Sequence, residues 1–319
     1  MDEGFTMRAA KLGDVAGITF VRQALNGAEI GQPFTDESET RTQLTSPDLD
    51  LATDWVVITA PTGELVGSGT VWPEAPFVEI YIDNYVHPGW AGHGIGSALL
   101  DWAEGRAEQV ALLAPQGERV VIRHGVWLGA RSPESFFERR GYRPVRFFQA
   151  LEATFAEPPP EPMWPDGISA RTMVRGADDR ALYEVKMAAF DDHWGGGEGT
   201  FDGWLHALDE EDGFDPGLVF LATDGDRFVG EAICRAETPD NPDGGYLLDL
   251  GVLREWRGQG IATALLHHAF GELYRRGYHH ITTAVDAESP TGAHRLYERV
   301  GMTPTYGHSI FERELVAAA

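Results

Sequence analysis

The sequence has one cysteine, half as many basic as acidic residues and no long hydrophobic run. Its single cysteine, Cys234, excludes an internal disulfide and is expected to be a small buried side chain in a reducing cytoplasm. With 25 Lys and Arg against 50 Asp and Glu, the net charge is −25. This argues against nucleic acid as a partner, because such binding depends on neutralised phosphates. The same charge favours cationic acceptors such as amines, or serves only solubility.

Apolar runs stay short of the roughly 18 residues that cross a bilayer, and the sequence does not open on a basic segment followed by an apolar one. We therefore expect no membrane partner, no secretory signal and a cytoplasmic location. Histidine pairs occur at 267–268 and 279–280, but adjacent histidines lack the i, i+4 spacing of helical metal sites. No metal is expected.

A proline-rich stretch divides the chain. Residues 152–167 read EATFAEPPPEPMWPDG, and prolines at this density cannot continue a helix or a central strand. The 319 residues are enough for two domains of ordinary size, each with its own core. We expect an amino-terminal domain at 1–151, an extended linker at 152–167 and a carboxyl-terminal domain at 168–319.

A strand–turn–helix segment carries the clearest functional signal. Tyr246–Val252 predicts a strand, Arg257, Gly258 and Gly260 a turn, and Ala262 and its successors a helix. The first N–H groups of such a helix are unpaired and the helix dipole adds partial positive charge, so the turn suits a diphosphate. Glycines let the backbone approach the oxygens, and the arginine can add a charge-assisted contact. Taken alone, such glycines are as often only a tight turn.

The same segment occurs twice. Residues 83–100 align with residues 249–266 without a gap, and both glycines and the Leu-Leu pair recur. The segment from Ser132 to Tyr142 likewise parallels the segment from Ser289 to Met302. The chain is therefore expected to be a duplicated unit.

These motifs resemble those of the GCN5-related N-acetyltransferase (GNAT) family. Arg257-x-x-Gly260-x-Ala262 has the family's form R/Q-x-x-G-x-G/A, and the run from Leu296 to Met302 has the form L-Y-E-x-x-G-F/M. The resemblance implies an α/β fold class with two tandem GNAT domains, each a mixed, mostly antiparallel sheet flanked by helices. It also implies acetyl-CoA as co-substrate. The two-domain layout is similar to mycothiol synthase and its tandem actinobacterial relatives, and the oligomeric state stays open.

In this family the turn holds the CoA pyrophosphate, and the strand before it pairs its backbone with the pantetheine. Carried onto this sequence, the cofactor-binding residues of the carboxyl-terminal copy are Leu250, Gly251, Val252, Arg257, Gly258, Gln259, Gly260, Ile261, Ala262, Thr263 and Ser289. Those of the amino-terminal copy are Tyr85, Val86, Gly92, His93, Gly94, Ile95 and Gly96. Ser289 stands where the family usually has Asn, which alters one polar contact to the cofactor.

The resemblance makes Tyr297 the acid that protonates the leaving thiolate, the alternative being a packed helical tyrosine. Asp249 is the candidate base, the alternative being a strand-edge carboxylate that faces solvent. Other candidates for the base are Glu231, Asp192 and His193. Carboxylates and an indole face can hold a cationic acceptor. The expected substrate-binding residues are Asp192, His193, Trp194 and Glu231.

The two copies differ where chemistry is expected. Ala91 replaces Arg257 and Phe137 replaces Tyr297, so the carboxyl-terminal copy is expected to be catalytic. The other copy either binds acetyl-CoA through its backbone or only supports the fold. The predicted function is acetyl-CoA-dependent N-acetylation of a small-molecule amine.

Two other functions stay open. One is mycothiol synthase proper, but mycothiol synthases place a glutamate early in the fourth strand, where Gly245–Leu248 here has none. The other is a non-catalytic acetyl-CoA-binding module, and the retention of Arg257 and Tyr297 argues against it.

Overall fold

The computed structural model describes residues 1–31, 35–128, 134–194, 200–210, 214–238, 241–288 and 292–315. The chain forms two compact units. The first unit comprises residues 1–147 and 307–319, and the second comprises residues 148–306. In the described part of the chain, no helix combines the length and the apolar character needed to span a bilayer.

The first unit contains a sheet of six strands with helices packed against it. Its elements are β1 (Thr6–Ala9), η1 (Leu12–Asp14), α1 (Val15–Ile30), α2 (Glu37–Leu44), β2 (Trp55–Thr59), β3 (Leu65–Trp72), β4 (Glu79–Val86), η2 (Pro88–Trp90), α3 (Ile95–Ala111), β5 (Val120–Trp127), α4 (Glu134–Arg139), the start of β6 (Arg143–Thr154) and most of β12 (Thr303–Leu315).

The second unit repeats this arrangement. Its elements are the end of β6, β7 (Ile168–Thr172), α5 (Asp179–Ala189), α6 (Phe201–Glu210), η3 (Pro216–Leu218), β8 (Val219–Asp224), β9 (Arg227–Thr238), β10 (Asn241–Val252), η4 (Arg254–Trp256), α7 (Ile261–Arg275), β11 (His280–Asp286), α8 (Ala293–Arg299) and the start of β12.

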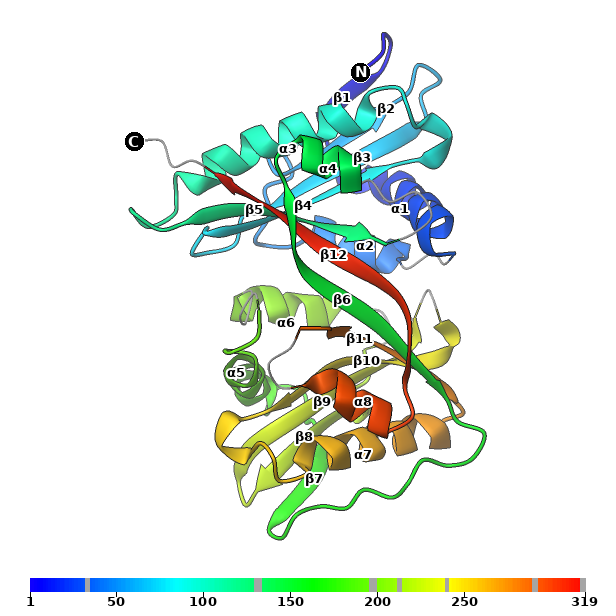
Figure 1. Ribbon diagram of the computed structural model, residues 1–319, viewed down its shortest axis with the longest axis vertical. Helices are drawn as coiled ribbons and strands as arrows, with labels where there is room; N and C mark the ends of the chain where they lie inside the picture. The colour runs from blue at the N-terminus through cyan, green and yellow to red at the C-terminus, as the bar shows by residue number, and fades with distance from the viewer. Residues whose placement is uncertain are drawn as a thin grey trace. The chain divides into compact units, whose positions relative to one another are not determined.

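Strand order is the same in both units, which confirms the fold expected from the sequence. The strands of the first unit are ordered β1-β2-β3-β4-β5-β12, and those of the second unit are ordered β7-β8-β9-β10-β11-β6. Neighbours are antiparallel except for the pairs β4–β5 and β10–β11, which are parallel. A parallel pair beside antiparallel strands makes each sheet mixed, and Figure 1 shows the long helices α3 and α7 lying along their sheets.

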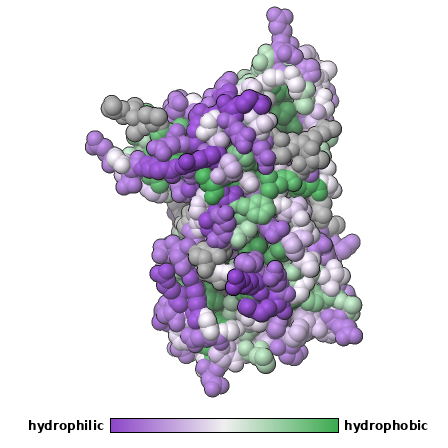
Figure 2. Space-filling model, viewed as in Figure 1, coloured by the Kyte–Doolittle hydropathy of each residue, from purple (hydrophilic) through white to green (hydrophobic). Residues whose placement is uncertain are grey.

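Glycines let helices approach the second sheet closely. A Cβ on Gly245 would come within 2.8 Å of Leu273 in α7, whereas a Cβ on Gly251 would come within 2.8 Å of Ala189 at the end of α5. The two glycines are six residues apart, and the bulge between Leu247 and Asp249 turns them to opposite faces of β10, so α7 and α5 pack on opposite sides of this strand. The apolar core of the α7 face includes fully buried Phe270 and Leu265. Side chains at the surface visible in Figure 2 are largely hydrophilic.

Two boundaries differ from those expected from the sequence. Strand β6 continues to Thr154 because Phe148–Thr154 pairs with β11 and buries Leu151 and Ala153, so the extended linker begins only after Thr154. The described carboxyl-terminal strand pairs with β5 from His308 to Leu315 and so belongs to the first unit. Strand β6 therefore joins the second sheet and strand β12 joins the first, each from the other half of the sequence. No local sequence pattern predicts this exchange.

Candidate active site

Glu231 on β9 is the most deeply buried acidic side chain of the second unit. It is 0% exposed, and neither carboxylate oxygen has a hydrogen-bond partner among the described residues. It lies across the ladder from Gly251, where a Cβ would come within 2.5 Å of Glu231 Oε1. Burial raises the pKa of the Glu231 carboxyl well above its ordinary value, Asp249 adds to the rise and Lys186 opposes it. This carboxyl is therefore set to exchange a proton at a higher pH than an exposed glutamate.

Asp249 on β10 forms an ion pair with Lys186 on α5. The Lys186 Nζ donates to Asp249 Oδ2 at 2.5 Å, and both side chains are mostly buried. Sequence reasoning proposed Asp249 as the base and did not identify Lys186. A signal was present, because Lys186 follows Asp178 by eight residues as Arg22 follows Asp14.

Tyr297 on α8 is buried against the same face as the core of α7. Burial raises the pKa of its phenol above the ordinary value of 10.0, and the charges of Glu231 and Asp249 add to the rise. A phenol in this environment stays protonated and can donate its proton. The charges of Glu231 and Asp249 therefore act on Tyr297, and Lys186 acts on both carboxyls, although the four residues come from α8, β9, β10 and α5.

The ladder between β10 and β11 ends beside this group. It pairs Gly245 with Ile281 and Tyr246 with Thr282, while β11 continues to pair with β6 as far as Asp286. A bulge between Leu247 and Asp249 shifts the register of β10 against β9 at the same point. From Leu248 onward, β10 has no ladder partner on β11 within the described residues. Its backbone groups there are available to an extended ligand.

The predicted anion-binding turn lies between β10 and α7 and contains two glycines. Gly258 and Gly260 have φ values of 75° and 92°, the left-handed region that glycine adopts without strain. Gly260 is the N-cap of α7 and provides no side-chain cap, so the first N–H groups of α7, including that of Thr263, lack a side-chain partner from the cap. Nothing among the described residues lies within 4 Å of a Cβ placed on Gly260. Ser289 lies outside the described residues.

Arg257 does not point freely toward the start of α7. Its guanidinium donates two bonds to Asp192, at 2.6 and 2.9 Å, and one each to the carbonyls of Ala189 and Val252. The Arg257 guanidinium holds the pKa of Asp192 below its ordinary value. Sequence reasoning assigned these two residues to the cofactor and the acceptor respectively, and the structure joins them. Arg257 thus fastens the segment after α5 to the turn before α7.

The two other residues predicted for the acceptor lie in the same segment. The ring nitrogen Nδ1 of His193 is 2.9 Å from the Trp194 carbonyl oxygen, to which it donates in the matching tautomer. The Trp194 ring packs on Phe148 with a centroid distance of 6.2 Å. Neither contact brings His193 or Trp194 to Glu231.

The first unit has a corresponding site with different side chains. Ser68 pairs with Tyr85 at the ladder position where Glu231 pairs with Gly251. Phe137 takes the motif position of Tyr297. A cation and an aspartate nevertheless recur, because Arg22 lies over the Tyr85 ring at 5.0 Å and the charge of Asp83 acts on it. Both units thus place a cation where it acts on the aspartate of the strand, but the ion pair is that of Lys186 with Asp249, and Glu231 and Tyr297 have no counterpart in the first unit.

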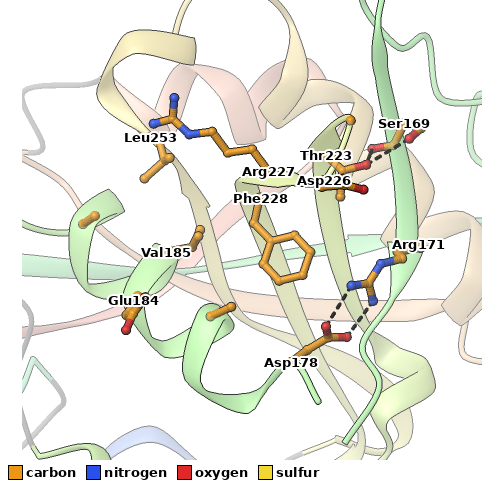
Figure 3. A pocket seen from close by; sticks show the side chains of 13 residues that line it. Ser169, Arg171, Asp178, Glu184, Val185, Thr223, Asp226, Arg227, Phe228 and Leu253 are labelled. Atoms are coloured by element: carbon orange, nitrogen blue, oxygen red, sulfur yellow. Dashed lines mark hydrogen bonds and ion pairs between the residues drawn. The ribbon is translucent and has the colours of Figure 1, made fainter.

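A separate cavity of about 750 Å³ lies between α5 and strands β7 to β9 (Figure 3). Arg171 donates a bidentate pair of bonds to Asp178 at its wall, at 2.6 and 2.8 Å, and stacks over Phe228. The first unit has the same bidentate pair between Arg8 and Asp14. Recurrence at the start of both first helices indicates a structural role. The lining of this cavity does not include Glu231 or Tyr297.

No group of three or more His, Cys, Asp or Glu side chains that could hold a metal ion is found in the ranges that the structure describes.

Comparison with known proteins identifies the family and related sequences. A model of the acetyltransferase (GNAT) family matches residues 180–302, and a model of an acetyltransferase (GNAT) domain matches residues 52–144. A protein of Geodermatophilus obscurus named mycothiol acetyltransferase is 31% identical over 303 residues, which is 91% of each chain. A similarly named protein of Streptomyces coelicolor is 32% identical over 254 residues, 77% of this chain and 75% of that protein.

Solved structures resemble the chain over almost its whole length. The crystal structure of a GCN5-related N-acetyltransferase from Sphaerobacter thermophilus has a TM-score of 0.78 and 35% sequence identity, and the match covers 98% of this chain and 96% of that one. A tandem GNAT protein from the clavulanic acid biosynthesis pathway has a TM-score of 0.72 over 99% of both chains. Its 16% identity supports the shared fold alone.

Proposed function

The chain belongs to the GCN5-related N-acetyltransferase family and is an N-acetyltransferase, and we propose that its second unit transfers the acetyl group of acetyl-CoA to a small-molecule amine. The observation that carries this proposal is the convergence of Glu231, the Lys186–Asp249 pair and Tyr297 at the end of the β10–β11 ladder. A proton acceptor and a proton donor would thereby lie next to strand backbone that has no ladder partner on β11 within the described residues.

Acetyl-CoA would lie along the end of β10 and across the turn before α7. Backbone groups of Leu250 and Val252 lack a β11 ladder partner among the described residues, which leaves β10 able to pair with pantetheine amides. The uncapped start of α7 offers N–H groups and the helix dipole to the pyrophosphate. The sequence expectation for Gly258 to Thr263 is supported by the open space above Gly260.

We assign the base to Glu231 rather than to Asp249. Asp249 is bonded to Lys186, and an aspartate with a cation also occurs in the first unit, where Phe137 replaces the acid. Glu231 is the carboxyl that differs between the units, and burial raises its pKa toward the range in which a base works at neutral pH.

The proposed reaction moves one proton at each end. Glu231 accepts a proton from the acceptor ammonium, directly or through water, and the free amine nitrogen attacks the thioester carbonyl. The C–S bond then breaks, Tyr297 donates its proton to the departing sulfur, and an amide and free CoA result. As the amide forms, the nitrogen loses its second proton, which returns to the phenolate directly or through water, and Glu231 releases its proton to solvent.

The acceptor is proposed to be a compact cationic amine. Two carboxyls, Glu231 and Asp249, belong to the proposed site, and the whole chain carries a net charge of −25. The curated relatives named mycothiol acetyltransferase make the cysteine-bearing amino-sugar precursor of mycothiol the second candidate. Mycothiol synthases place a glutamate early in the strand that corresponds to β10. This chain has Tyr246 there and no carboxylate from Gly245 to Leu248, and the difference favours a different amine.

A panel assay tests both candidates. Acetyl-CoA is incubated with aliphatic, aromatic and sugar amines and with the cysteinyl amino sugar, and acetylated products are identified by mass spectrometry because thiol acceptors interfere with thiol detection of CoA. We expect a product with at least one amine, and its loss in Glu231→Gln and Tyr297→Phe. If the wild type binds acetyl-CoA and acetylates nothing in the panel, a non-catalytic binding module becomes the better description.

A further inference from the structure

His124 on β5 occupies, in the first unit, the place that Thr283 has in the second. The bulge between Leu247 and Asp249 adds one residue to β10, so Gly245 is the counterpart of Ile80. The parallel ladders pair Ile80 with Ile122 and Gly245 with Ile281. Two residues further along each strand, on the same face, stand His124 and Thr283. Both are almost fully buried. A small hydroxyl beside the proposed thioester site of the second unit is thus replaced by an imidazole ring.

The His124 ring extends across the end of the β4–β5 ladder. Its Nε2 accepts a bond from the Asn84 N–H at 3.2 Å, and its Nδ1 donates to the Gly125 carbonyl at 2.6 Å. The ring centroid is 4.6 Å from that of Phe137. Burial lowers the pKa of His124, which agrees with a neutral ring that donates at one nitrogen and accepts at the other.

The two residues that contact the His124 ring, Asn84 and Phe137, show which part of the site the ring occupies. Asn84 aligns with Leu250, whose backbone is proposed to pair with pantetheine, and Phe137 aligns with Tyr297, which is proposed to protonate the thiolate. The imidazole therefore fills the space that the reacting end of acetyl-CoA would take, and it uses the strand N–H that the cofactor would need.

The start of α3, which corresponds to the proposed pyrophosphate site at the start of α7, is covered by other residues. Gly94 is the N-cap of α3, as Gly260 is of α7. A Cβ on Gly94 would come within 2.8 Å of the backbone nitrogen of Met1, whereas the space above Gly260 is open in the described structure. The Asp2 N–H donates to the His93 carbonyl at 3.1 Å, and the Asp2 carboxylate lies 2.8 Å from His93 Nδ1. The Met1 backbone and the Asp2 carboxylate thus lie at the start of α3, where a pyrophosphate would bind.

We infer that the first unit closes its own acyl-CoA site with His124 and residues 1–2, so that each chain binds one acetyl-CoA, in the second unit. This inference rests on the proposed function of the second unit. It decides between the two roles that the sequence left open for the first unit, in favour of support of the fold.

Matched substitutions at the third residue of each helix test it. Thr263→Glu in α7 and Ser97→Glu in α3 each add a carboxylate to the first turn, where it is favourable for the helix itself but repels a bound pyrophosphate. Isothermal titration of acetyl-CoA into the full-length chain should give a stoichiometry of one for the wild type. Thr263→Glu should weaken binding about tenfold or more, and Ser97→Glu should leave affinity and stoichiometry unchanged.

Other outcomes are informative in different ways. Two sites in the wild type, or a loss of one site in Ser97→Glu, would overturn the inference while the proposed function stands. Retention of full affinity in Thr263→Glu together with a loss in Ser97→Glu would place the cofactor in the first unit and overturn both. An absence of any binding by the folded wild type would instead remove the proposed function. Circular dichroism of all three proteins verifies that they are folded.

Discussion

The Glu231 carboxylate lies directly over the backbone of Gly251, on the neighbouring strand. We predict that Gly251→Ala lowers both stability and turnover. The new Cβ would come within 2.5 Å of Glu231 Oε1 and 2.8 Å of the Ala189 Cβ, so the buried carboxyl and α5 must shift. Overpacking of this kind typically costs about 1–3 kcal/mol. Urea denaturation and kcat measure the two effects. Gly271→Ala is the control, because its Cβ would meet open space on α7 and should stabilise the helix by roughly 0.5–1 kcal/mol.

Glu231→Gln should reduce kcat by roughly 10²–10⁴ and remove the acidic limb of the pH profile, because glutamine cannot accept the ammonium proton. In the wild type, activity should fall as the pH drops through the raised pKa of Glu231, so the limb should lie above the ordinary glutamate value of 4.5. A steady-state rate profile from pH 5 to pH 9, under saturating acetyl-CoA, measures this. An unchanged limb in Glu231→Gln would show that another group is the base.

The same substitution should stabilise the folded chain. Because folding raises the Glu231 pKa, the folded state binds its proton more tightly than the unfolded state does. Stability therefore declines by about 1.4 kcal/mol per pH unit between the ordinary and the raised pKa, and the loss persists above that window. Glutamine does not ionise, so Glu231→Gln should have a higher melting temperature than the wild type at pH 8. The difference should vanish below the ordinary pKa of glutamate. A variant that melts lower at pH 8 contradicts this account.

Tyr297→Phe should reduce kcat by roughly 10²–10⁴ with little change in acetyl-CoA affinity, because only the proton donated to the leaving sulfur is lost. The first unit already carries a phenylalanine, Phe137, at this position and buries it, so the substitution is compatible with the fold. Stopped-flow or steady-state rates combined with titration calorimetry separate kcat from binding. A rate equal to that of the wild type would reduce Tyr297 to a packing residue.

Lys186→Met should lower turnover at neutral pH and move the acidic limb to higher pH. The ammonium opposes the rise in the Glu231 pKa, and its removal also leaves the mostly buried Asp249 carboxylate without its ion-pair partner. Lys186→Arg is the matched control, because Arg22 occupies the equivalent place in the first unit, and it should restore the position of the limb. If Lys186→Met loses activity with no shift of the pH profile, its role is structural rather than electrostatic.

Arg257 and Asp192 should show strong energetic coupling. A double-mutant cycle with Arg257→Ala and Asp192→Ala, measured by urea denaturation, should give a coupling free energy of about 1–3 kcal/mol, because the two bonds are charge-assisted and the side chains are 27% exposed. Arg257→Ala should also weaken acetyl-CoA binding if the turn depends on this anchor. Additive single effects would show that the pair does not fasten the segment after α5.

The sequence predicted the local parts of this molecule well. The Gly-bearing turn, the helix after it and the strand before it follow from neighbouring residues, and their duplication revealed two units of the same fold. Helix α1 passes through Gly27, a residue that often ends a helix, and ends at Gly31, whose φ of 82° is left-handed. A lone glycine lowers helix propensity by only about 1 kcal/mol, which the packing of α1 overcomes.

The sequence alone therefore determined the duplication, the α/β class, the turn before α7 and the identity of Tyr297 as the distinguishing phenol, because each depends on residues close together in the chain. Only the tertiary structure decided that Glu231 is buried with no hydrogen bond to its carboxylate oxygens among the described residues, that Lys186 neutralises Asp249, that Arg257 binds Asp192 and that His124 fills the first unit's site. Burial, ion pairing and proton affinity depend on which strands and helices meet, and those contacts join residues 20 to 65 positions apart.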